Sequence, residues 1–156
     1  MSIGEVKALL FDTFGTVVDW RGSISRQMAA EFPDEACDWP AFADAWRARY
    51  QPSMEAVRSG KRPFVVLDVL HRENLEATAA EFGLTGLAND RLERVNRFWH
   101  TLDPWPDSVP GMMRLQKRFA IVAQSNGNVA LMVDMKRHAG IPWDMILGAE
   151  VVGYYK

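Results

Sequence analysis

The sequence predicts an α/β fold in which a parallel sheet carries a long helical insertion. Three short apolar stretches are typical of buried strands, at residues 6–12, 119–124 and 145–149. Between the first two, apolar side chains repeat at helical spacing from about residue 23 to residue 99. Strands that are joined through helices form parallel sheets, so we expect the carboxyl ends of these strands to meet at one edge.

Length and composition indicate an ordinary folded domain. The chain has 156 residues, of which 48% are apolar and 24% charged, and its net charge of −2 argues against a protein that neutralises nucleic-acid phosphates. Cys37 is the only cysteine, which excludes an intrachain disulfide and a cysteine-based zinc site. The apolar runs are too short to span a bilayer, and the N-terminus lacks the pattern of a signal peptide, so we expect a cytoplasmic protein.

The insertion is predicted to contain four helices. Their expected ranges are 23–32, 39 to about 52, 64–82 and 89–101. Pro52 is expected to stop the second helix, Gly83 to follow the third and Asn89 to cap the fourth.

Three prolines within residues 103–111 indicate a linker without helix or central strand that returns the chain to the sheet. Two further helices are expected around the second strand, at residues 112–118 and at residues 129–139, the latter ending at Gly140.

The strongest candidate for chemistry is Asp12, which directly follows the first strand. A carboxylate that is partly desolvated and rigidly held there could act as a nucleophile and form an ester, although taken alone a turn-capping aspartate is the commoner case. Thr16 lies four residues later and could donate to Asp12, or it could bond its own backbone. Lys156 could keep a buried carboxylate ionised, or it could be a solvated charge.

Two further groups of residues could bind an anion. Ser125 and Asn126 follow the second strand where a helix begins, a place that binds anions but also suits a plain N-cap. Arg47 and Arg49 lie beside Trp46 and Tyr50 in the second helix of the insertion. An arginine fork suits a carboxylate or a leaving anion, whereas for any single arginine a surface position is the commoner case.

The other polar and aromatic residues give weaker signals. Trp20, close to the first strand, is the tryptophan that we expect to face a pocket. The three histidines have no ligand-like spacing, so we predict structural or surface roles and no metal site for His71, His100 and His138.

Three motifs, in this order, resemble those of the haloacid dehalogenase superfamily. Residues 8–17, with the apolar strand, Asp12 and a Gly-Thr turn, resemble its first motif, and residues 122–127 resemble its second, an apolar strand that ends in Ser-Asn. Residues 153–156 resemble the third motif, in which a lysine follows an aromatic residue. The resemblance covers essentially the whole chain, and the stretch between the first two motifs matches the helical cap of the family.

The resemblance implies a Rossmann-like core with an inserted helical cap. We expect the core to comprise residues 1–20 and 106–156, and the cap to comprise residues 21–105. Members of the family continue beyond the third motif with a helix, a strand and a fourth, acidic motif. This chain ends at Lys156, so we expect a core that is truncated at its C-terminus.

One position indicates the branch of the superfamily. The phosphatases carry a second aspartate two residues after the nucleophile, which protonates the leaving group and whose backbone helps to hold Mg²⁺. Phe14 stands at that position here, as an aromatic does in the 2-haloacid dehalogenases, which use no metal. Arg47, within Ala45-Trp46-Arg47, matches their substrate-binding arginine. The tracts 46–52 and 104–111 resemble a group in which some members act on short haloacids, including fluoroacetate.

The resemblance implies hydrolytic dehalogenation of a short 2-haloalkanoate without a cofactor. Asp12 would form the ester, Thr16 would orient it and Lys156 would stabilise its charge. The residues expected to bind substrate or halide are Phe14, Trp20, Arg47, Ser125 and Asn126. A small haloacid is the expected partner, nucleic acid and membrane are not, and a homodimer is compatible with this type of enzyme. The alternatives are a Mg²⁺-dependent phosphatase of the same superfamily and a truncated, non-catalytic fragment.

Overall fold

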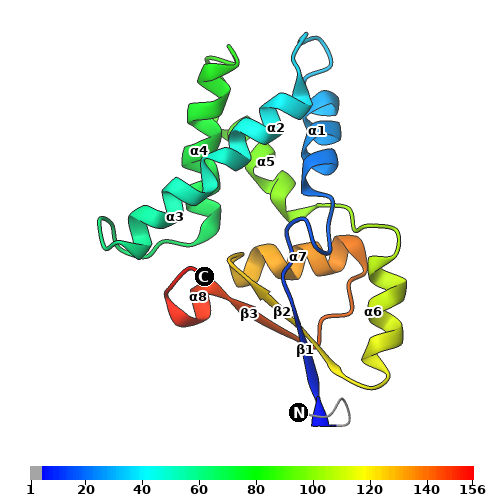
Figure 1. The fold of residues 1–156 in the computed structure, drawn as a ribbon. Coiled ribbons are helices and arrows are strands. Elements are labelled where there is room, and N and C mark those ends of the chain that lie inside the picture. Colours follow the sequence, from blue (N-terminus) through cyan, green and yellow to red (C-terminus); the bar gives the residue numbers. More distant parts are fainter. Residues whose placement is uncertain (1–4) are drawn as a thin grey trace.

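The computed structural model describes residues 5–156, and its centre is a sheet of three parallel strands (Figure 1). The strands are β1 (Ala8–Phe11), β2 (Ala120–Ser125) and β3 (Met145–Gly148), in the order β1-β2-β3. Leu10 pairs with Val122, and Val122 pairs with Met145. The predicted parallel sheet is therefore confirmed. The expectations for the N-terminal end of the core and for a missing signal peptide fall partly on residues 1–4, outside the described residues.

The two faces of the sheet differ in burial. Ile121 and Ala123 are fully buried and join one core cluster with side chains of α6 (Ser108–Gln116) and α7 (Val129–Ala139). On the opposite face Leu10 is 54% and Met145 56% exposed. Since strand side chains alternate between faces, the two crossover helices cover one face. The other face exposes Leu10 and Met145 on the outer strands, whereas Val122 between them is 6% exposed.

The insertion between β1 and β2 forms a helical cap beyond the carboxyl end of β1 (Figure 1). Its elements are α1 (Trp20–Glu31), α2 (Trp39–Ala48), α3 (Tyr50–Arg58), α4 (Leu67–Glu81), α5 (Asn89–Asn96) and the 3₁₀-helix η2 (Arg97–His100). Large aromatic side chains fill its interior. Trp46 and Trp99 are each 1% exposed, and their ring centres lie 5.4 Å apart. The Trp46 indole N–H donates to the His71 backbone carbonyl at 2.9 Å.

The prediction that Pro52 stops the second helix was wrong. That helix is divided at Arg49 into α2 and α3, and Pro52 lies in the first turn of α3. A proline is tolerated there because the first N–H groups of a helix have no partner within the helix. The same reason places Pro110 in the first turn of α6, which begins at Ser108 rather than at residue 112.

Several helix starts also differ from the prediction. The Asp19 carboxylate accepts from the Gly22 N–H at 2.8 Å, so α1 begins at Trp20, three residues earlier than predicted. The fourth predicted helix is divided into α5 and η2, and Asn89 does not cap it, because its side chain accepts from Arg72 at 2.7 Å.

The remaining boundaries are close to those predicted. α4 begins at Leu67 rather than at residue 64, because Val66 is extended, and β2 lies one residue later than predicted. The short helix α8 (Ala149–Val152) was not predicted. Gly83 and Gly140 follow their helices with φ of +78° and +67°, as predicted for glycines at helix C-termini.

The different burial of the two sheet faces predicts different costs of truncation. We expect Ile121→Ala to lower the free energy of unfolding by about 2–5 kcal/mol, because it leaves a cavity under α6 and α7. The matched change on the open face, Leu10→Ala, should cost less than about 1 kcal/mol. Urea denaturation followed by circular dichroism measures both, and equal losses would contradict a sheet that is covered on one face.

Candidate active site

The Asp12 carboxylate lies directly after β1 and is held by two donors. The Thr16 hydroxyl donates to Asp12 Oδ2 at 3.1 Å, and the Lys156 ammonium donates to Asp12 Oδ1. The Asp12 side chain is 48% exposed and therefore about half-buried, in line with the expectation of a partly desolvated carboxylate. Two positively polarised donors, rather than burial, define the position of both oxygens.

The turn that carries Asp12 and Thr16 is closed by backbone hydrogen bonds. The N–H groups of Val17 and Val18 donate to the Thr13 carbonyl at 2.9 and 3.3 Å. Gly15 has φ of +89°, a conformation that side-chain-bearing residues rarely adopt. The Trp105 indole N–H donates to the Gly15 carbonyl at 3.1 Å, so the linker that returns from the cap braces this turn.

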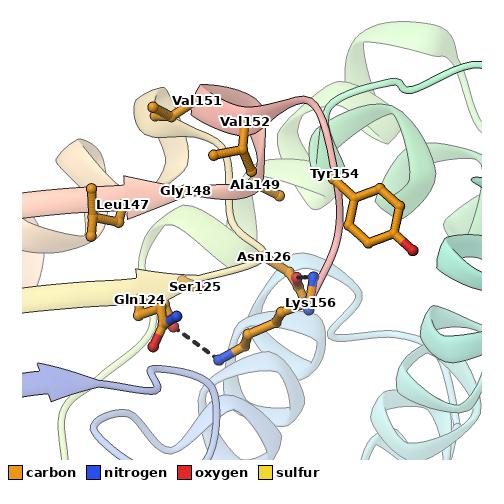
Figure 2. A pocket seen from close by; sticks show the side chains of 10 residues that line it. All are labelled: Gln124, Ser125, Asn126, Leu147, Gly148, Ala149, Val151, Val152, Tyr154 and Lys156. Atoms are coloured by element: carbon orange, nitrogen blue, oxygen red, sulfur yellow. Dashed lines mark hydrogen bonds between the residues drawn. The ribbon is translucent and has the colours of Figure 1, made fainter. Parts of the chain in front are cut away.

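Lys156 connects the turn after β1 to the end of β2. Its ammonium also donates to the Gln124 carbonyl at 2.9 Å, and its backbone N–H donates to Asn126 Oδ1 at 2.8 Å (Figure 2). The preceding Tyr155 is fully buried, and its hydroxyl donates to the carbonyl of Val65 in the cap at 2.6 Å. Core and cap together therefore fix the lysine beside Asp12.

The turn after β2 is buried and internally bonded. Ser125 is 4% exposed, and its hydroxyl accepts from the Gly127 N–H at 3.1 Å. Asn126 is also buried and uses its carbonyl oxygen to hold Lys156. A hollow of about 200 Å³ adjoins this turn on the side of β3 and α8 (Figure 2). Its walls are formed by Gln124, Ser125, Asn126, Leu147, Gly148, Ala149, Val151, Val152, Tyr154 and Lys156.

Arg47 projects from the cap into a cluster of aromatic rings. Its Cζ atom lies 3.8 Å from the ring centre of Tyr50, 5.7 Å from that of Trp20 and 6.0 Å from that of Phe14. Its Nη1 atom is buried and has no hydrogen-bond partner. A buried, unpaired guanidinium N–H is costly, and an anion such as a carboxylate or a halide would satisfy it.

Tyr50 belongs to the same cluster, a position that sequence reasoning left open. Burial raises the pKa of its phenol, against the charge of Arg47 and a hydrogen bond to Asn126, and the charge of Asp12 adds to the rise. Tyr50 therefore lies where Arg47, Asn126 and Asp12 meet. No sequence signal marked this position, because Arg47 lies in α2 and Tyr50 begins α3, so their contact depends on how the two helices meet. Arg49 is directed elsewhere, pairing with Glu81 at 2.6 Å.

His71 borders this cluster, with 6.0 Å between its ring centre and that of Tyr50, whereas His100 and His138 have other partners. His71 is stacked on Trp99 with 4.4 Å between ring centres, and burial lowers its pKa to about 3, so its ring is neutral. His138 contacts Asp103 at 3.2 Å, and the buried His100 lies between two carboxylates. Within residues 5–156 no three histidine, cysteine or acidic side chains are grouped as metal ligands would be, and no helix is long and apolar enough to cross a membrane.

Solved structures that are similar to this chain include haloacid dehalogenases. The chain is 48% identical to an L-2-haloacid dehalogenase and 51% identical to a defluorinating L-2-haloacid dehalogenase, with TM-scores of 0.91 and 0.90. Both alignments cover 97% of this chain, which spans 65% and 63% of the length of those enzymes.

A more distant structure shares the fold alone. The L-2-haloacid dehalogenase from Xanthobacter autotrophicus, solved with chloropropionic acid covalently bound, is 19% identical with a TM-score of 0.84, and the alignment covers 97% of this chain and 60% of that one. A scan against protein-family models and a search of curated proteins gave no match.

Gly148 lies so close to Gly127, beside the site, that we expect it not to tolerate a side chain. A Cβ added at Gly148 would lie 2.5 Å from the Gly127 carbonyl oxygen, in the turn that carries Ser125 and Asn126. We expect Gly148→Ala to lower the free energy of unfolding by about 1–3 kcal/mol and to shift the amide resonances of that turn. The control Gly111→Ala, which meets only a side-chain atom at 3.9 Å, should be neutral or stabilising. Unchanged turn resonances in Gly148→Ala would contradict the packing described.

Proposed function

The chain belongs to the haloacid dehalogenase superfamily, and we propose that its site performs the displacement step of a 2-haloacid dehalogenase. The two relatives near 50% identity are named L-2-haloacid dehalogenases. One observation carries the proposal. Asp12 is oriented by Thr16 and Lys156, and the cap holds the unpaired Arg47 nitrogen beside Phe14, two residues further along the same turn.

The substrate proposed is a short 2-haloalkanoate. Arg47 supplies the charged donor for its carboxylate or for the departing halide, and Phe14 and Trp20 form apolar walls beside it. Asn126 is placed to assist through its amide group, since its carbonyl oxygen is used by Lys156. Ser125 supports the turn by accepting from Gly127, and so contributes by holding Asn126 in place.

In the first step, an oxygen of the Asp12 carboxylate attacks the halogen-bearing carbon from the side opposite the halogen. A carbon–oxygen bond forms, the carbon–halogen bond breaks, and the halide leaves with the bonding pair. The products are an aspartyl ester and a halide ion. Lys156 and Thr16 hold the carboxylate in one orientation, and such positioning can lower a barrier by about 7–11 kcal/mol in favourable cases.

In the second step, water attacks the carbonyl carbon of the Asp12 ester. The bond between that carbon and the alkyl oxygen breaks, which releases a 2-hydroxy acid, restores the carboxylate and liberates one proton. The Lys156 ammonium, bonded to the Asp12 oxygen, stabilises the negative charge that develops during this attack.

The identity of residue 14 favours this reaction over phosphate transfer. A phenyl ring cannot protonate an alkoxide leaving group, and a halide leaves without a proton. The phosphatase alternative would require a second acidic group at that position.

We further propose a core of residues 1–20 and 106–156 and a cap of residues 21–105. The proposal also includes a cytoplasmic location, a homodimer and catalysis without a metal cofactor. The non-catalytic alternative is separated from the proposed chemistry by the two experiments that follow.

The nucleophile predicts a covalent product. Incubation with chloroacetate should add one carboxymethyl group to the wild-type chain, detectable by intact mass, or release chloride without a lasting adduct where the ester is hydrolysed. Asp12→Asn should give neither, because an amide oxygen is a poor nucleophile. Asp107→Asn, a change at an exposed carboxylate that makes no capping hydrogen bond, should behave as wild type. Neither adduct nor chloride from a folded wild-type sample would favour the non-catalytic alternative.

The unpaired guanidinium predicts a loss of substrate binding. Arg47→Met should raise the chloroacetate concentration that gives half-maximal reaction by about 10- to 100-fold, since a hydrogen bond to a charged group contributes about 1.5–3 kcal/mol. The matched control Arg49→Met removes an arginine that pairs with Glu81, and should leave that concentration unchanged. Equal effects of the two changes in the chloride-release assay would contradict the assignment of Arg47.

A further inference from the structure

A buried histidine joins the cap to the core through two carboxylates. His100, at the end of η2, is 5% exposed. Its Nδ1 lies 2.8 Å from an oxygen of Asp134 in α7, and its Nε2 lies 3.1 Å from Oδ1 of Asp68 in α4. Ionised carboxylates only accept hydrogen bonds, so both ring nitrogens must donate and the ring must be charged. Burial lowers the pKa of His100, but the hydrogen bonds to the two carboxylates outweigh it and leave the pKa raised.

The second oxygen of Asp68 extends this contact to the site. Asp68 Oδ2 accepts from the side-chain amide of Asn128 at 2.8 Å. Asn128 is 4% exposed and stands two residues after Asn126, in the turn that begins at Ser125. Asn126 in turn holds the Lys156 backbone. A continuous line of hydrogen bonds and short backbone therefore runs from His100 to the lysine beside Asp12.

The other described polar and charged groups around His100 do not supply a second positive charge beside the Asp68 carboxylate. Arg97, on η2 itself, lies 3.5 Å from Asp134 and supplies that carboxylate with a second positive partner. From α4, His71 is neutral at ordinary pH. α1 contacts the η2 backbone through the uncharged Gln27, while its charged Arg26 pairs with Asp103.

From α5, the side-chain amide of Asn96 donates to the backbone carbonyl of Asp68 at 3.0 Å and not to its carboxylate. Loss of one proton from His100 would remove its positive charge and leave a single ring N–H for the two carboxylates of Asp68 and Asp134. Where that N–H stays on Nδ1 toward Asp134, the Asp68 carboxylate, which is 27% exposed, keeps one of its two described donors, Asn128. A mostly buried carboxylate that loses a charged donor is destabilised, so Asp68 is expected to move.

We propose that His100 is a positioning residue for the reaction. Its protonated ring holds Asp68 between the cap and the core, and Asp68 holds Asn128 so that the turn with Ser125 and Asn126 stays aligned with Lys156. This role rests on the proposed function of that turn. His100 itself contacts neither Asp12 nor Arg47 in the hydrogen bonds described, and it acts through Asp68.

The proposal is tested by nuclear magnetic resonance on the whole chain, without any substrate. The His100 ring protons and the amide signals of Asn126 and Asn128 are followed as pH is raised. We expect Asn126 and Asn128 to shift with the midpoint of His100, above the ordinary histidine pKa of 6.5. A histidine that only fills space would stabilise the fold without producing a titration at Asn126.

Two variants isolate the source of that shift. In His100→Gln the step at Asn126 should be lost, whereas His138→Gln, which alters the exposed contact with Asp103, should retain it. Where His100→Gln does not fold, Asp68→Asn provides the test, because it keeps the size of the side chain. In that variant the step should be lost and the His100 midpoint should fall.

An Asn126 signal that stays constant while the His100 ring titrates would overturn the proposal, as would a step that persists in Asp68→Asn. These readings need no turnover. Failure of the chloroacetate experiment would therefore count against the proposed function, whereas a constant Asn126 signal would count against the positioning role alone.

The contact of His100 with the two carboxylates also predicts how the free energy of unfolding changes with pH. The pKa of His100 is raised on folding, so its contribution to stability is fully present below the ordinary value of 6.5 and is lost as pH rises through the folded value. The difference in unfolding free energy between wild type and His100→Gln should shrink over that range. A difference that grows with pH would contradict a charged ring between two carboxylates.

Discussion

The contact between Lys156 and Asp12 is the interaction on which the rest of the site depends. It joins residues 144 positions apart in the chain, and the same ammonium reaches the carbonyl of Gln124 at the end of β2. The parallel sheet makes this possible, because it brings the carboxyl ends of β1 and β2 to one edge. Both partners are about half exposed, so geometry set by the backbone, rather than a low dielectric, fixes the carboxylate in this chain.

The cap positions Arg47, the second charged group of the proposed site. Its aromatic interior, centred on Trp46 and Trp99, holds α2 and α3 rigidly enough to leave one nitrogen of Arg47 buried and unpaired. An unsatisfied charged group lowers stability, and natural proteins accept such a cost mainly at functional sites. Tyr155, donating to Val65, attaches the segment that carries Lys156 to the same cap. The cap therefore affects the positions of both Arg47, the proposed anion-binding group, and Lys156.

The sequence predicted local features well where one strand or turn defines them. Asp12 and Thr16 fall in one turn after an apolar strand, and the structure shows the hydrogen bond between them that their spacing suggested. Pro52 and Pro110 misled the helix boundaries, since a proline marks a helix start as readily as a helix end. Tyr50 and the His100–Asp68 contact could not be found in this way, because they depend on how separate helices pack.

The central claim is that the Asp12 carboxylate, and not water, attacks the substrate. The most direct measurement is a single-turnover reaction of this chain with chloroacetate in water enriched in ¹⁸O, followed by mass analysis of the peptide that contains Asp12. The account predicts that ¹⁸O enters the Asp12 carboxylate, because water attacks the ester carbonyl. Label in the hydroxy acid with none in Asp12 would contradict it.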